Sequence, residues 1–347
     1  MLKKRSLGLI LIAILVLLPV ACKKGGSADL PLGSVGDFRT LIAKDAAGFA
    51  IMNFKAMAEK GLFDELIKDE ESLKGLNDFK KKTGLDPKKD LQTGIIVFMN
   101  LPSGPQDTNQ NMYFAVSGKF DQKKILASMK AEAKAGFKTE SVSGYTLYHG
   151  VEINAETAQT APATPKDIFI SFKGNDLIFF SPDKNAILTA CQLADGKKEG
   201  LAKDSLVYEM TDKVNHDHMF WGLFTIPEAA KKEMENGPGM MFPAFKDITA
   251  IYFGGTYDGK ALLFDANLYT AKDESLKELT TTLNSFKDMI KSFAAQGEGQ
   301  SPETAKAMAV IDKIKISQEK ESVKITVSLT KEELESLSPK PAESAVE

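Results

Sequence analysis

Short apolar or alternating runs are the clearest pattern along the chain, and they predict β-strands. Most runs are bounded by Gly, Pro, Asn or Asp, which favour turns over continued strands. Residues 172–177 and 256–260 join two runs each through Gly, Asn and Asp, which tolerate the positive φ of tight turns and so predict β-hairpins. Clear strand predictions are Phe49–Phe54, Gly94–Met99, Met112–Ser117, Tyr145–His149, Ile168–Phe172 and Leu177–Ser181.

Between these runs, apolar residues recur at the helical period. The clearest helix is predicted over residues 273–295, where apolar side chains spaced by three and four form one stripe facing a core. Other helices are predicted over residues 55–82 (with a break), 122–135 and 184–193. Strands that form hairpins, interleaved with helices, are typical of an α+β fold.

The order of elements repeats along the chain. The strand Phe49–Phe54 and its helix resemble Phe220–Phe224 followed by a helix at Pro227. Residues 90–98, a further strand and a helix at Asp121 likewise resemble residues 247–253, a strand and a helix at Asp273. The sequence therefore predicts two similar halves of antiparallel sheet packed by helices, residues 37–198 and 199–337, with a polar seam near residues 195–204.

The first 22 residues have the pattern of a bacterial export signal. Three basic residues at positions 3–5 precede the apolar run Leu7–Leu18, which is too short to span a bilayer core of roughly 30 Å. Val20-Ala21-Cys22 resembles the lipobox of bacterial lipoproteins, although Pro19 stands where that family prefers Leu. The resemblance implies that residues 1–21 are a signal peptide and that Cys22 carries acyl chains such as palmitate.

The resemblance also implies a place in the cell. Acyl chains on Cys22 would attach the protein to a membrane of the cell envelope, and residues 22–36, rich in Gly and Ser, would form a flexible tether. An Asp after the modified Cys resembles an inner-membrane retention signal. Lys23 stands there instead, which favours the outer membrane. Residues 338–347 are predicted to be a disordered tail.

The body of the chain resembles uncharacterised bacterial envelope proteins with domains of unknown function. The resemblance rests on Gly84–Leu91, on Val116–Asp121 and on a hairpin over Ile314–Leu329 followed by a helix at Lys331. It implies antiparallel sheets packed by helices and assigns no chemistry.

Composition and charge exclude some classes of protein. The chain is 43% hydrophobic and 26% charged, as in an ordinary globular protein. Its formal charge is −3, and removal of the three basic residues of the signal makes it −6. A net acidic chain argues against a nucleic-acid partner. With Cys22 acylated, Cys191 has no disulfide partner and is predicted to be a buried apolar residue.

Candidate chemistry is sparse. His216 and His218 would project to one side of a strand and are weak candidates for a metal site, but no third ligand stands at suitable spacing. Ser328 and Lys331 match the Ser-x-x-Lys spacing of penicillin-interacting enzymes, whereas Thr330 and Glu333 fit a helix capping box better. No cofactor motif occurs, and the sequence predicts a non-enzymatic protein; an envelope hydrolase with a non-local site is an alternative.

Met240, Met241 and Phe242 lie in an apolar loop punctuated by Gly and Pro, residues 236–243. Such a loop either packs on its own core or contacts a ligand, because Met adapts to irregular apolar surfaces. The leading hypothesis is a lipid-anchored envelope protein with a binding or structural role towards an unknown protein or lipid. The alternative is a carrier or sensor of an apolar, lipid-like ligand.

Overall fold

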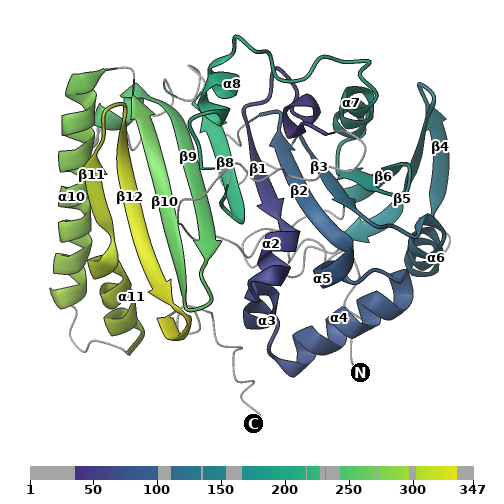
Figure 1. Cartoon of the computed structure of the whole chain (residues 1–347), viewed down its shortest axis with the longest axis horizontal. Helices are drawn as coiled ribbons and strands as arrows, with labels where there is room; N and C mark the ends of the chain where they lie inside the picture. Colours follow the sequence, from purple (N-terminus) through teal and green to yellow (C-terminus); the bar gives the residue numbers. More distant parts are fainter. Residues whose placement is uncertain are drawn as a thin grey trace. The chain divides into compact units, whose positions relative to one another are not determined.

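A computed structural model describes residues 36–100, 111–133, 136–153, 166–215, 217–226, 231, 243–270, 272–296 and 302–333. They belong to two compact units, one ending at Thr225 and the other beginning at Ile226 (Figure 1). Both units contain antiparallel sheets packed by helices, which confirms the predicted α+β class.

The described strands of the first unit form an antiparallel sheet in the order β8-β1-β2-β3-β7-β6-β5-β4. Their bounds are β1 Gly48–Asn53, β2 Leu91–Phe98, β3 Met112–Gly118, β4 Lys138–Val142, β5 Tyr145–Ile153, β6 Lys166–Lys173, β7 Leu177–Ser181 and β8 Phe220–Thr225. Its helices are η2 Phe38–Leu41, α2 Phe54–Glu59, α3 Leu62–Leu66, α4 Glu70–Thr83, α5 Pro87–Asp90, α6 Gln122–Ala133, α7 Lys184–Ala194 and α8 Leu206–Thr211.

The predicted break in the helix over residues 55–82 divides it into α2, α3 and α4. Asn53 caps α2 by accepting a hydrogen bond from the backbone N–H of Ala56, so β1 ends one residue earlier than predicted. Gly61, at φ 75°, separates α2 from α3. Asp69 caps α4 by accepting from the N–H of Ser72.

One face of the first sheet forms the core of the unit, and we call it the inner face. Phe49, Val97 and Trp221 project from β1, β2 and β8 onto this face, and all three are fully buried. The rings of Phe49 and Trp221 meet edge to face with centroids 5.4 Å apart. The hydroxyl of Tyr113 donates to the Leu41 carbonyl at 2.7 Å, which ties η2 to the sheet. Helix α7 packs on β3, β6 and β7, and the buried thiol of Cys191 faces Ser171 of β6.

The division between the units differs from the seam expected at residues 195–204. The first unit continues through α8 and β8 because β8 pairs with β1, with Ile51 opposite Trp221. Strand β8, which the sequence assigned to the second half, thereby belongs to the first sheet.

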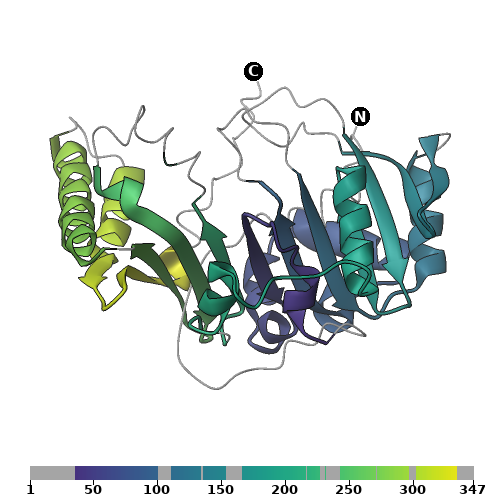
Figure 2. The ribbon, with the colours of Figure 1, turned by 90° about the horizontal axis from the view of Figure 1, so that it is seen from above.

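The second unit contains a four-stranded described sheet with α10 along one side (Figures 1 and 2). Its strand order is β11-β12-β10-β9. The elements are η6 Pro243–Asp247, β9 Ile248–Tyr257, β10 Ala261–Thr270, α10 Asp273–Gln296, α11 Pro302–Lys313, β11 Lys315–Gln318 and β12 Ser322–Thr330. Leu276 and Leu279 of the predicted stripe are buried against Leu268 and Val323, whereas Phe286 is 43% exposed.

The same arrangement occurs once in each unit. In the first, the β2–β3 hairpin is followed by α6, and the later strand β7 pairs with β3. In the second, the β9–β10 hairpin is followed by α10, and the later strand β12 pairs with β10. The repeated order of elements read from the sequence thus corresponds to a repeated topology.

Candidate functional site

Most residues singled out from the sequence lie outside the described residues: Cys22, His216, Met240, Met241 and Phe242. His218 is described and is 1% exposed, with its Nε2 atom 3.1 Å from the Asn215 amide nitrogen. In the described part of the chain no three His, Cys, Asp or Glu side chains are arranged to hold a metal ion. His218 therefore has a place in the hydrogen bonding of the fold.

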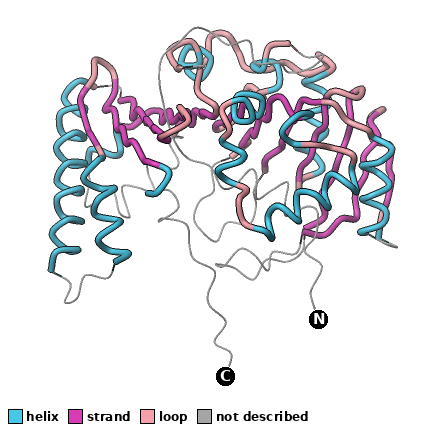
Figure 3. Tube along the Cα trace, turned by 60° about the horizontal axis from the view of Figure 1, so that its bottom comes forward, coloured by secondary structure: helices cyan, strands magenta, loops and turns pink. Residues whose placement is uncertain are grey.

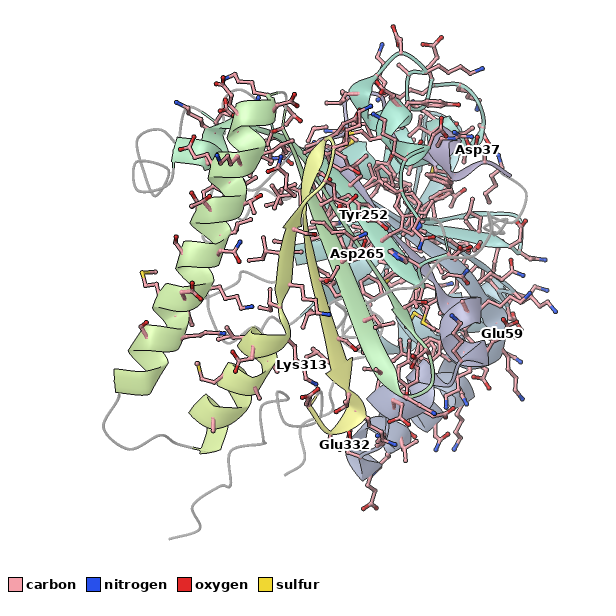
Figure 4. The ribbon with its side chains drawn as sticks, turned by 60° about the vertical axis from the view of Figure 1, so that its left-hand side comes forward. Asp37, Glu59, Tyr252, Asp265, Lys313 and Glu332 are labelled. Atoms are coloured by element: carbon pink, nitrogen blue, oxygen red, sulfur yellow. The ribbon has the colours of Figure 1, made fainter. Side chains whose placement is uncertain are left out.

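The pair Ser328 and Lys331 does not form the arrangement of a penicillin-interacting enzyme, because Ser328 lies within β12. The predicted capping box is confirmed. The backbone N–H of Thr330 donates to Glu333 Oε2 at 2.8 Å, and the N–H of Glu333 donates to Thr330 Oγ1 at 3.4 Å. Lys313, at the end of α11 (Figure 4), pairs with Glu333 at 2.5 Å and lowers the pKa of that carboxyl.

Two surface carboxylates are held in their charged form by lysines. Asp195 accepts from Lys173 Nζ at 2.9 Å and from the Tyr145 hydroxyl at 3.1 Å, and the lysine contact chiefly lowers its pKa. Asp247 pairs with Lys272 at 2.8 Å, which likewise lowers its pKa. A carboxyl that acts as a general acid needs a raised pKa. The lowered pKa of Asp195 and Asp247 keeps them charged and suits them to ion pairs between neighbouring elements.

The thiol of Cys191 is also unsuited to nucleophilic chemistry. Burial raises its pKa to about 11, which keeps it protonated at neutral pH. The prediction of a buried apolar residue is confirmed, since its exposed fraction is 3%.

The feature of the first unit that can hold a ligand is the second face of its sheet, which we call the aromatic face. Side chains alternate along a strand, so the residues between those of the inner face project here. Several of them, among them Phe98, Phe114 and Phe224, are half-buried, whereas Met52, Val116, Ile178 and Phe220 on the same face are buried. The aromatic face consists of Ala50, Ile96, Phe98, Met112, Phe114, Ile168, Ile170, Phe180 and Phe224.

A glycine lets two rings of the aromatic face meet. Gly48 lies opposite Phe98 on β2 and opposite Phe224 on β8. Because Gly48 has no side chain, these rings approach across it with centroids 5.3 Å apart. A Cβ on Gly48 would lie only 2.4 Å from Phe224 Cδ1, so a larger residue would displace that ring.

Further along the aromatic face, Phe114 of β3 and Phe180 of β7 stack in parallel. Their centroids are 4.6 Å apart and their planes differ by 6°. Phe114 is half-buried and Phe180 is 6% exposed, so the outer ring still contacts solvent. Contiguous apolar side chains that remain in contact with water favour an apolar ligand or partner.

Among the described helices, α2 and α5 pack on β2, and α2 covers part of this face. There the Phe54 ring of α2 lies over Gly94, where an added Cβ would be 2.8 Å from the ring. Sequence reasoning missed the aromatic face, because its residues come from six strands. The available signal was the alternation of Met112 and Phe114 with the core residues Tyr113 and Ala115.

Fold and site together define an α+β protein built from antiparallel sheets, with an apolar surface on one face of the first. No family model matches the chain, and no curated protein matches it. Crystal structures of TP0453 are similar. Crystal form III gives a TM-score of 0.44 at 9% identity over 85% of this chain and 95% of that one. Crystal form I gives 0.41 at 9% identity over 90% and 96%. Likenesses of this size assign neither a family nor a function.

The described helices include no candidate for a membrane span. None of them combines the length and the apolar composition needed to cross a bilayer.

Proposed function

We propose that the protein is a lipid-anchored component of the bacterial cell envelope with a non-enzymatic binding or structural role. The observation that carries the proposal is the run from Met1 to Cys22, with its basic start, short apolar stretch and lipobox-like end. Acyl chains on Cys22 would hold the body at the outer membrane. The first described residue, Gly36, follows a tether that leaves the body room to stand off the bilayer.

Metabolic labelling with radioactive palmitate tests the anchor. The wild-type chain takes up label, and Cys22→Ala abolishes it because the acceptor thiol is gone. Cys191→Ala is the matched control, since it removes the chain's other cysteine and leaves the lipobox intact. Undiminished labelling of Cys22→Ala contradicts the proposal, and fractionation of labelled cells tests the outer-membrane location.

The aromatic face supports a second candidate function, a carrier or sensor of an apolar ligand. Its rings form a ready surface for an acyl chain or a similar molecule. Native mass spectrometry of residues 23–347 from the periplasm, followed by solvent extraction, is expected to detect a bound lipid at a fixed ratio.

A pair of variants locates that ligand. Phe114→Ala opens the stacked pair on the aromatic face and is expected to lower ligand occupancy. Phe286→Ala removes an exposed ring of α10 in the other unit and is expected to leave occupancy unchanged. A bare wild-type mass, or equal occupancy in the two variants, contradicts the carrier function.

A further inference from the structure

Lysines are concentrated where the end of α4, the helix α5 and the start of α6 come together. Residues 80–90 and 119–124 contain eight lysines and three aspartates, a local charge of +5 in a chain whose formal charge is −3. We call this surface the basic patch. Its lysines are Lys80, Lys81, Lys82, Lys88, Lys89, Lys119, Lys123 and Lys124.

Contacts between the two segments make the basic patch one surface. The backbone N–H of Lys119 donates to the Asp90 carbonyl at 2.8 Å, which places the end of β3 beside α5. The aliphatic chain of Lys124 lies over Gly84, where an added Cβ would be 2.9 Å from Lys124 Cδ. Helices α4 and α6 also pack together, as Figures 1 and 3 show.

Half of these lysines are engaged in ion pairs. Lys80 pairs with Asp86 at 3.1 Å and Lys82 with Glu132 at 2.9 Å. Lys124 lies 3.6 Å from Asp121, and Lys88 pairs with Asp64 of α3. Three of these pairs join neighbouring elements, and exposed pairs of this kind each contribute at most about 1 kcal/mol.

The other four lysines, Lys81, Lys89, Lys119 and Lys123, are exposed. Within the described residues none of the four lies within ion-pair distance of a carboxylate. Their charge is therefore available to an external anion.

We propose that the basic patch binds the anionic headgroups of a phospholipid surface. All the cationic side chains of the patch are lysines, whose flexible point charge suits dispersed phosphates better than one fixed bidentate site. Two large apolar side chains on the adjoining helices, Leu66 of α3 and Leu73 of α4, are 42% and 40% exposed. Apolar side chains beside cationic ones favour a lipid surface over a soluble polyanion.

This proposal deepens the proposed attachment to a membrane and rests on it for its cellular setting. Anchoring by Cys22 would raise the local concentration of lipid around the body, and the basic patch would then orient that body. Each lysine near an anionic surface strengthens binding by roughly fivefold.

Vesicle flotation tests the basic patch without the anchor. The protein is residues 22–347 carrying Cys22→Ser, which takes no acyl chain. It is expected to float with vesicles of phosphatidylethanolamine and phosphatidylglycerol, to remain behind with phosphatidylcholine alone, and to be released by high salt. Because lipidation plays no part, failure here leaves the palmitate-labelling result untouched.

Two matched quadruple variants locate the surface. The patch variant carries Lys81→Gln, Lys89→Gln, Lys119→Gln and Lys123→Gln, and its vesicle partition coefficient is expected to fall roughly tenfold or more. The control variant removes the same charge from exposed lysines elsewhere and is expected to lose much less. It carries Lys203→Gln, Lys260→Gln, Lys315→Gln and Lys320→Gln.

Circular dichroism and thermal unfolding establish that both variants are folded before binding is compared. Equal wild-type binding to both kinds of vesicle overturns the proposal. An equal loss in the two variants also overturns it, because binding would then follow net charge and not this surface.

Discussion

Replacement of Gly150 by Ala tests the backbone geometry at the irregularity in β5. The register between β5 and β6 shifts between Tyr148 and Val151, and Gly150 lies there at φ 103°. A Cβ at this position would lie 1.9 Å from the carbonyl oxygen of Gly136, and a backbone atom cannot rotate away as a side chain can. Gly150→Ala therefore combines an unfavourable φ with a steric clash.

Gly144 allows the two costs to be separated. It lies in the turn between β4 and β5 at φ 83°, and an added Cβ would meet no atom within 4 Å. Gly144→Ala is expected to cost about 1–2 kcal/mol from the left-handed conformation alone. Gly150→Ala adds roughly 1–3 kcal/mol for the backbone displacement, giving a total of about 2–5 kcal/mol.

Urea unfolding followed by the fluorescence of Trp221, the chain's single tryptophan, measures both costs in the first unit. A lower midpoint at an unchanged m-value identifies a loss of native stability. Equal losses in the two variants, within about 0.5 kcal/mol, would refute the reasoning, because the clash with Gly136 would then contribute nothing.

Three further predictions concern individual side chains. Asp247→Asn is expected to flatten the pH dependence of thermal stability in acid. Lys272 lowers the pKa of Asp247 in the folded state. The stabilisation from this ion pair is therefore present above the unfolded pKa of about 3.9 and is lost as pH falls through the folded pKa. A steeper or unchanged acid profile of melting temperature would contradict this. Cys191 is expected to react with a thiol reagent at pH 8 only after unfolding, because burial raises its pKa to about 11, and rapid labelling of the native chain would disprove the burial. Thr330→Ala is expected to lower the free energy of unfolding, measured by chemical denaturation, by about 1 kcal/mol, because the capping contact to the Glu333 N–H is lost. Thr330→Ser keeps a hydroxyl acceptor at this position and is expected to retain most of that stability.

Local patterns predicted the elements of the fold well where a single periodicity prevailed. The stripe over residues 273–295 corresponds to α10, Asp273–Gln296, because a long apolar period has no competing interpretation. Residues 172–177 and 256–260 form the turns of the β6–β7 and β9–β10 hairpins, since Gly and Asp fixed their position. By contrast, β4, Lys138–Val142, was not predicted, because it has few apolar residues and no strand pattern of its own. Its hydrogen-bonded pairing with β5 stabilises the strand instead.

The surfaces that we propose to be functional were much less accessible to sequence reasoning. The basic patch joins residues 80–90 to residues 119–124, and only the contacts at Gly84 and Asp90 show that the two segments meet. The aromatic face depends on strand register in the same way, since Phe98 and Phe224 become neighbours only through Gly48. The proposed lipidation site, Cys22, could be predicted from the sequence because the pattern of a secretion signal is contiguous along the chain.

The pairing of β1 with β8 also sets the order in which the first unit can be completed. Ile51 is synthesised early, but its partner Trp221 follows only after the whole of residues 54–219. Contacts so distant along the chain slow folding, because the loop-closure entropy must be overcome before the contacts can stabilise anything. A nascent chain that has reached β7 therefore still presents the apolar edge of β1 to its surroundings.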